Sequence, residues 1–182
     1  QKINDYRIFS NYGLILKNQG KLQEAELLLK KTMQMNPNWF IAHNNMGTIQ
    51  KDLGKLQEAE LSFRKAIEIK PDYPEAHYNL GKVFKDLGKF QEAELSYRKA
   101  IEIKPDYADA HYNLGIIFKN LGKYQEAELS YRKAIDIKPD YAEAHSNLGN
   151  VFRDLGNFQE AELSYLKTIE LNPNYSKAYY SL

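Results

Sequence analysis

Cysteine is absent from the 182-residue sequence, which excludes a disulfide framework and any metal site built on thiolates. No run of apolar residues approaches the ~20 that a membrane-spanning helix needs, so no membrane contact is expected. Charge of one sign is also lacking, because 25 Lys and Arg oppose 24 Asp and Glu and leave a net charge of +1. That balance gives no electrostatic reason to expect a nucleic acid as partner. These absences are compatible with a cytoplasmic protein, which is the location we expect.

The most informative feature of the sequence is internal repetition. Residues 74–107 and 108–141 are nearly identical, and glycines and prolines recur along the chain at a step of 34 residues. They are Gly13, Gly47, Gly81, Gly115 and Gly149, then Gly20, Gly54, Gly88, Gly122 and Gly156, and finally Pro37, Pro71, Pro105, Pro139 and Pro173. A fixed period of this length indicates a repeat array. The predicted organisation is a lead-in at 1–5, repeats at 6–39, 40–73, 74–107, 108–141 and 142–175, and a truncated sixth repeat at 176–182 that suggests a longer array.

Each repeat is predicted to be a pair of helices. In the repeat 74–107, apolar residues at helical spacing indicate a first helix at about 75–87 and a second at about 91–103. Asp72 and Glu75 have the spacing of a capping box, and Gly88 is expected to end the first helix in the left-handed conformation. Gly81 lowers helix propensity in mid-helix, which suggests that it lets the second helix approach closely. One pair cannot bury both apolar faces, so stacking on neighbours is expected.

Residues at fixed places within the period identify the kind of repeat. In the third repeat these residues are His77, Leu80, Gly81, Phe84, Ala93, Tyr97, Ala100 and Pro105. The pattern resembles the tetratricopeptide repeat, with His in place of the usual Trp in four repeats and Phe9 in the first. The resemblance implies an all-α fold, a right-handed superhelical solenoid of five helical hairpins plus a partial sixth. It also implies that the first helices line a concave groove and that the chain is a non-catalytic scaffold for protein–protein interaction.

Two patterns suggest chemistry, but their geometry argues against it. The row His43, His77, His111 and His145 invites a zinc hypothesis. Zinc ligands lie about 2 Å from one ion, whereas equivalent residues of stacked helices are about a helix diameter apart, so a structural role is favoured. The repeated Gly-Lys pairs have the wrong spacing for a phosphate-binding loop. We therefore expect no metal, no cofactor and no catalytic centre.

The first helices carry a polar face beside the apolar one. Its residues form an Asn row (Asn11, Asn45, Asn79, Asn113 and Asn147) and a Lys row (Lys17, Lys51, Lys85, Lys119 and Arg153), with Tyr78, Lys82 and Tyr112 beside them. The Asn row resembles the asparagine ladder of O-linked N-acetylglucosamine transferase arrays, which implies a grip on the backbone of an extended peptide. An Asn amide offers both a donor and an acceptor, as a peptide group does. The alternative is that each Asn only bonds the backbone of a neighbouring repeat. Acidic residues leave this face near neutral, which argues against a phosphate-binding strip.

The second helices depart from the usual family pattern at two places. Each has a Glu directly after its first Ala, at Glu26, Glu60, Glu94, Glu128 and Glu162. A Leu follows each Glu, and we call Leu27, Leu61, Leu95, Leu129 and Leu163 the outer Leu row. These leucines point about 200° away from the core-facing Ala. We expect each to pack partly on the adjacent repeat, and the alternative is a surface for self-association.

Three hypotheses of function remain open. The first is a non-catalytic scaffold whose partner is a protein or peptide, bound as an extended and possibly acidic segment in the groove of the first helices. The second is the substrate-recruiting arm of a larger enzyme, such as a glycosyltransferase. The third is a self-assembly scaffold that associates through the outer Leu row.

Overall fold

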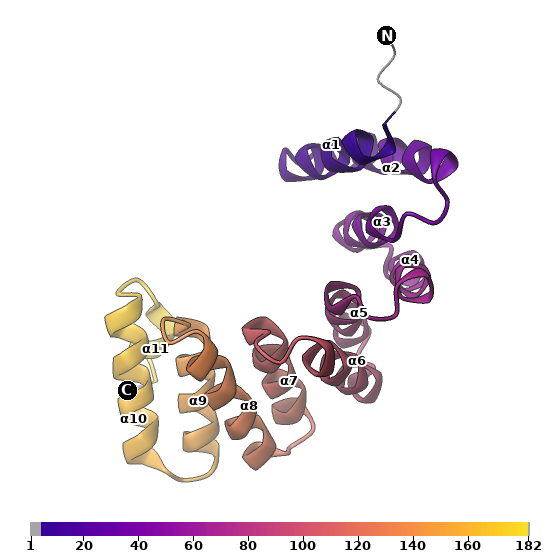
Figure 1. Cartoon of the computed structure of the whole chain (residues 1–182). Helices are drawn as coiled ribbons and strands as arrows, with labels where there is room; N and C mark the ends of the chain where they lie inside the picture. Colours follow the sequence, from indigo (N-terminus) through magenta and orange to yellow (C-terminus); the bar gives the residue numbers. More distant parts are fainter. Residues whose placement is uncertain (1–4, 182) are drawn as a thin grey trace. The chain divides into compact units, whose positions relative to one another are not determined.

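The computed structural model describes residues 5–181, so most of the lead-in at 1–5, together with residue 182, lies outside the described residues. The described residues form eleven α-helices (Figure 1). They are α1 (Tyr6–Asn18), α2 (Leu22–Met35), α3 (Phe40–Asp52), α4 (Leu56–Ile69), α5 (Pro74–Asp86), α6 (Phe90–Ile103), α7 (Ala108–Asn120), α8 (Tyr124–Ile137), α9 (Ala142–Asp154), α10 (Phe158–Leu171) and α11 (Ser176–Tyr179). The predicted all-α fold class is confirmed.

The chain divides into two compact units, Gln1–Lys89 (unit 1) and Phe90–Leu182 (unit 2). In unit 1, α1 pairs with α2 and α3 with α4, and the second helix of each pair packs against the next first helix. In unit 2, α7 pairs with α8 and α9 with α10 in the same way, and α6 packs against α7. The first helices of successive repeats also contact each other: α1 contacts α3, α3 contacts α5, and α7 contacts α9. This stacking of hairpins on their neighbours is a solenoid architecture.

Glycine ends the first helices as the sequence predicts. Gly88 has a φ of 72°, in the left-handed region that favours glycine. Its N–H donates to the Lys85 carbonyl at 3.0 Å, and the Lys89 N–H donates to the Phe84 carbonyl at 2.8 Å, which together make a Schellman motif. The predicted capping box is wrong, because α5 begins at Pro74 with Tyr73 as N-cap and without a side-chain capping bond. Proline suits that first position because its missing N–H would have no partner there.

The core of each repeat lies between its two helices. In unit 2 the buried side chains of α7 and α8 include Ile117, Phe118 and Tyr131, and small residues bring the two helices together. A Cβ added to Gly115 would lie only 2.7 Å from Cε1 of Tyr131, and Gly149 has the same relation to Tyr165. Mid-helix glycine therefore makes room for an aromatic ring of the facing helix. This is the close approach that the sequence suggested.

The histidine row contacts the loops that connect successive repeats. The Nε2 atoms of His43, His77, His111 and His145 lie 2.7–3.0 Å from the carbonyl oxygens of Pro37, Pro71, Pro105 and Pro139. Each His thus ties its helix to the proline six residues earlier, in the loop that enters the repeat. Residues 5–181 contain no group of three or more His, Cys, Asp and Glu that could hold a metal ion. These contacts give the histidines the structural role that the sequence predicts.

None of the helices within residues 5–181 is long and apolar enough to cross a bilayer.

Candidate functional site

The candidate site is the polar surface of the first helices, α1, α3 and α5 in unit 1 and α7 and α9 in unit 2. Successive first helices contact each other within each unit, so equivalent positions form rows across them. The Asn row and the Lys row lie on these helices, about one and a half and three turns from their starts. Most of their side chains are half-buried, and this partial cover by neighbours restricts their rotamers.

Three members of the Asn row donate a hydrogen bond to the repeat before their own. Asn45 Nδ2 donates to Ser10 Oγ at 3.3 Å, and Asn79 Nδ2 donates to Asn44 Oδ1 at 3.1 Å. In unit 2, Asn147 Nδ2 donates to the Tyr112 hydroxyl at 2.9 Å. Each partner lies 35 residues earlier, one period plus one residue. The sequence alternative of a bond to a neighbouring repeat is therefore right for these three residues, although the partners are side chains rather than backbone.

Two members of the Asn row differ from the rest. Asn113 is buried, and its Nδ2 donates to the Asp109 carbonyl at 2.9 Å, one turn earlier in its own helix α7. Asn11 lies on α1 and is exposed. An amide carries two N–H donors and a carbonyl oxygen, so one bond does not exhaust the polar capacity of Asn45, Asn79 or Asn147.

Three members of the Lys row form ion pairs with the repeat that follows their own, whereas the Asn row bonds the repeat before. Lys17 Nζ lies 3.2 Å from Asp52 Oδ2, and Lys51 Nζ lies 3.7 Å from Asp86 Oδ2. In unit 2, Lys119 Nζ lies 3.4 Å from Asp154 Oδ2. Each Asp follows its Lys by 35 residues. Sequence reasoning counted these aspartates as charges on the same face but did not identify them as the partners of the lysines. No signal in the sequence identified these partners, because the shift of one residue beyond the 34-residue period comes from the way the first helices stack.

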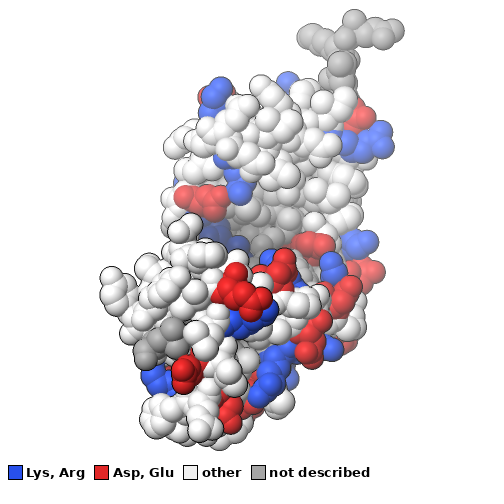
Figure 2. Space-filling model, turned by 90° about the vertical axis from the view of Figure 1, so that its left-hand side faces the viewer, with Lys and Arg blue, Asp and Glu red and all other residues white. Residues whose placement is uncertain are grey.

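Arg153, the last member of the Lys row, joins the same group. Its Nη2 lies 3.6 Å from Asp154 Oδ1, so Asp154 contacts both Lys119 and Arg153. The acidic and basic side chains therefore alternate along the surface of the first helices. Figure 2 shows the same interleaving of the two signs on the face that it draws, without a large patch of a single sign. The expectation of a face without a uniform phosphate-binding strip agrees with this pattern.

The densest group of lysines in unit 1 lies on α3 and α5. Lys82 Nζ lies 5.5 Å from the centre of the Tyr78 ring, within the range of a cation–π contact. Burial lowers the pKa of Lys82, and the charges of Lys51 and Lys85 lower it further, whereas Asp52 and Asp86 oppose the shift. Burial also lowers the pKa of Lys85, Asp86 opposes this shift, and Lys51 adds to it. These ammonium groups are thus partly desolvated beside the aspartates that pair with the Lys row.

Tyr112 occupies the corresponding place in unit 2 and packs against two other tyrosines. Its ring centre lies 4.8 Å from that of Tyr141 and 5.9 Å from that of Tyr131. Burial raises the pKa of Tyr112 to about 12, and its hydroxyl accepts the bond from Asn147. The Tyr141 hydroxyl in turn donates to Asp109 Oδ1 at 2.9 Å. These contacts hold the aromatic surface of unit 2 in one arrangement.

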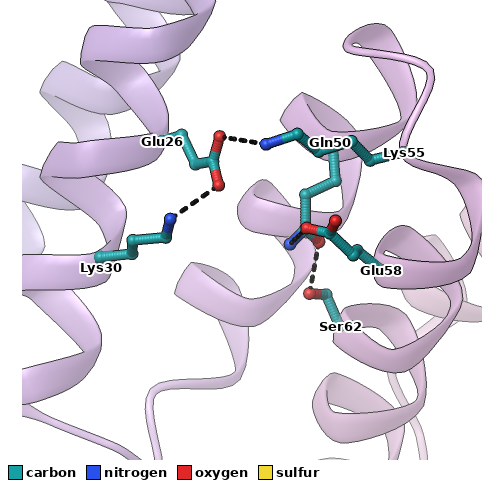
Figure 3. Close-up of polar contacts among 6 residues, drawn as sticks. All are labelled: Glu26, Lys30, Gln50, Lys55, Glu58 and Ser62. Carbon is teal, nitrogen blue, oxygen red and sulfur yellow. Dashed lines mark hydrogen bonds and ion pairs between the residues drawn. The ribbon is translucent and has the colours of Figure 1, made fainter.

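The outer glutamates also bridge repeats, which accounts for their departure from the family pattern. Glu26 is nearly buried, and its two oxygens pair with Lys30 of the same helix at 2.8 Å and with Lys55 of the next repeat at 2.9 Å (Figure 3). The same bridge recurs from Glu60 to Lys89 and from Glu94 to Lys123. Lys30 and Lys55 hold the pKa of Glu26 below its usual value.

A second polar group lies beside that bridge. Ser62 Oγ donates to Gln50 Oε1 at 2.6 Å, and Gln50 Nε2 donates to Glu58 Oε2 at 3.4 Å (Figure 3). Gln50 comes from α3, whereas Glu58 and Ser62 come from α4. The two helices of the second repeat are thus held together by polar contacts as well as by their apolar core.

The outer Leu row is largely exposed. Between 66% and 71% of each of Leu27, Leu61, Leu95, Leu129 and Leu163 is open to solvent. The sequence predicts that each leucine packs partly on the adjacent repeat, and in the structure the covered part is the minor one.

An all-α solenoid with polar residues aligned from repeat to repeat is characteristic of helical repeat proteins, and comparison with known families identifies which class is present. A family model described as TPR repeat matches residues 48–88 and 81–122. Models described as Tetratricopeptide repeat match residues 108–141 and 142–175, and residues 6–38. Together these matches cover most of the chain, which is built of tetratricopeptide repeats and belongs to that family.

Solved structures with the same fold cover nearly all of the chain. MamA protein is 27% identical over 94% of this chain and 94% of that chain, with a TM-score of 0.80. YrrB, described as a TPR protein with an unusual peptide-binding site, is 21% identical over 97% of this chain and 91% of that chain, with a TM-score of 0.78. PilF of Pseudomonas aeruginosa is 15% identical over 95% and 79%, with a TM-score of 0.88. Among curated proteins, none matches the sequence.

Proposed function

We propose that this chain is a non-catalytic scaffold that binds an extended segment of a partner protein along its first helices. The observation that carries the proposal is the row of half-buried Asn amides, Asn45 and Asn79 in unit 1 and Asn147 in unit 2, each held by a bond to the preceding repeat. A side chain already fixed by one bond loses little further rotamer entropy when it binds a ligand. The two amides of unit 1, on the successive first helices α3 and α5, suit the peptide groups of an extended chain.

The lysines of unit 1 give this surface a preference among peptides. Lys82 and Lys85 are partly buried with lowered pKa values, and Lys51 lies close enough to contribute to both shifts. A carboxylate from the ligand would compensate the desolvated positive charge, whereas a Lys or Arg of the ligand would add to the repulsion. We infer that the bound segment carries an acidic side chain where it passes α5. The pKa of Lys82 should then rise when such a peptide binds.

The proposal is tested with an array of unphosphorylated peptides that differ in net charge, followed by titration of the best ones in solution. A double variant, Asn45→Ala with Asn79→Ala, should weaken binding about 10-fold or more, since each net hydrogen bond is worth about 0.5–1.5 kcal/mol. Asn38→Ala, which changes an exposed Asn in the loop between α2 and α3 and outside the Asn row, is the matched control and should bind as wild type does.

The charge preference has its own pair of variants. Lys82→Gln should reduce the affinity for acidic peptides and make it less sensitive to salt, because one screened attraction is lost. Lys65→Gln removes the same charge from α4, where Lys65 pairs with Glu68, and should have little effect. If the folded Asn45/Asn79 variant keeps wild-type affinity for every peptide found, these amides are structural only and the proposed site is wrong.

A further inference from the structure

Unit 2 presents exposed leucines on three second helices. Leu95 on α6, Leu129 on α8 and Leu163 on α10 are each about two-thirds exposed, and they occupy equivalent places in consecutive repeats. On α10, Phe158 is 70% exposed and Leu166 47% exposed. Single exposed leucines are ordinary, but a group of large apolar side chains on one set of helices is typical of an interaction surface.

A groove lies beside this group, between α8 and α10 and above α9. Its volume is about 420 Å³, and its apolar lining consists of Ile135, Leu148, Phe152 and Leu163. Arg132 borders it, with its guanidinium 5.3 Å from the centre of the Phe152 ring. The groove therefore has an apolar floor and one apolar wall, a shape that fits an aliphatic side chain such as Leu.

Charged residues flank each exposed leucine in a constant order. On α8, exposed Glu126 lies one turn before Leu129 and exposed Lys133 one turn after it. The same order, Glu then Leu then Lys, occurs on α6 and α10, at Glu92 and Lys99 and at Glu160 and Lys167. If two copies of this surface meet with their helices antiparallel, the Glu of one copy faces the Lys of the other. With the helices parallel, like charges would face each other.

We propose that unit 2 binds a second copy of this chain through these helices, in an antiparallel contact with two-fold symmetry. Leu129 of each copy sits in the groove between α8 and α10 of the other, and Glu126 of each faces Lys133 of the other. A two-fold contact uses the same patch on both copies, so the patch must be complementary to itself. The charge order around the leucines meets that requirement, and it is the reason for choosing a second copy over an unrelated apolar segment. The contact does not involve the Asn row or the Lys row, so it is independent of the proposed peptide binding.

The first test is the oligomeric state of the full chain, measured by sedimentation equilibrium up to roughly 1 mM, where even an interface smaller than about 1,200 Å² would be populated. Wild type should form dimers in this range. Leu129→Ser should weaken the association about 10-fold or more, because the dimer buries this leucine twice. Leu61→Ser changes an equally exposed leucine of unit 1 and should leave the association unchanged. A wild-type chain that stays monomeric at every concentration would overturn the proposal, as would equal effects of the two substitutions.

The second test establishes the antiparallel arrangement. Glu126→Lys alone places Lys against Lys in the dimer, and Lys133→Glu alone places Glu against Glu, so each variant alone should be mainly monomeric. A mixture of the two variants restores opposite charges at both contacts and should form a heterodimer, with circular dichroism confirming that both are folded. Dimers that persist in the single variants, or a mixture that remains monomeric, would contradict the proposed pairing of Glu126 with Lys133.

Discussion

Changing Gly115 to Ala is the most direct test of how the two helices of a repeat are spaced. A Cβ at this position would lie 2.7 Å from Cε1 and 2.8 Å from Cδ1 of Tyr131. Carbon atoms pack at about 3.5–4.0 Å, so the two groups must separate by roughly 1 Å. Tyr131 is fully buried, which leaves its ring little freedom to move unless α8 moves with it.

The size of the effect follows from two opposing contributions. Overpacking in a close-packed core costs about 1–3 kcal/mol, whereas Ala is favoured over Gly in mid-helix by about 0.8–1.0 kcal/mol. We therefore expect Gly115→Ala to lower the free energy of unfolding by about 1–2 kcal/mol. At Gly13 the nearest atom is Leu29 Cγ at 3.2 Å, which needs a shift of only a few tenths of an ångström. Gly13→Ala should thus change stability by less than about 0.5 kcal/mol, since the two contributions nearly cancel.

The measurement is urea denaturation followed by circular dichroism for wild type and both variants. A further variant combines Gly115→Ala with Tyr131→Leu, which places Ala against Leu as in the Gly13→Ala variant of the first repeat. Because the shorter side chain relieves the collision, the double variant should lose less stability than the sum of its two single changes. If Gly115→Ala is as stable as Gly13→Ala, the collision with Tyr131 does not exist and the account of the helix spacing fails.

Two further predictions concern the contacts between repeats. Lys30 and Lys55 depress the pKa of Glu26 below its ordinary value of 4.5, so this carboxylate stabilises the fold at neutral pH and the contribution disappears as the pH falls below that value. Glu26→Gln should lower the free energy of unfolding by about 1 kcal/mol at neutral pH and flatten its loss in acid, as measured by thermal unfolding over a pH series. His111→Phe removes the bond to the Pro105 carbonyl and should cost about 0.5–1.5 kcal/mol by chemical denaturation. Zinc should leave the melting temperature of wild type unchanged, and a zinc-dependent rise would revive the metal hypothesis.

The fold follows from sequence because its signals are local and repeated. The apolar spacing, the glycine after each first helix and the mid-helix glycine predict the hairpin, and repetition at a step of 34 residues predicts the stack. The element boundaries are nearly right as well, with α5 at Pro74–Asp86 against an expected 75–87. The capping prediction at Asp72 fails because Pro74 and the packing of Tyr73 set the start of the helix. Its N-terminus is therefore fixed without a side-chain cap.

The contacts of the candidate site could not be predicted in the same way. A helical projection gives the direction of a side chain around its own helix, but not which residue of the neighbouring helix it meets. The bonds from Asn79 to Asn44 and from Lys51 to Asp86 both span one period plus one residue, because adjacent first helices lie side by side with a small shift. Only the stacked structure supplies that shift. The assignment of the Asn and Lys rows as a peptide site remains a prediction.

A helical projection was also insufficient to predict the exposure of the outer Leu row. The projection correctly turned these leucines away from the core, yet it could not tell how far the next repeat extends over them. In unit 1 the bridges from Glu26 to Lys55 and from Glu60 to Lys89 occupy the junctions between repeats. In unit 2, Glu94 and Lys123 do the same. Glu128 pairs with Arg132 of its own helix, yet Leu129 is as exposed as Leu61 and Leu95, whose preceding glutamates bridge two repeats. The position of these leucines around the helix, and not the bridge beside them, therefore leaves them open to solvent.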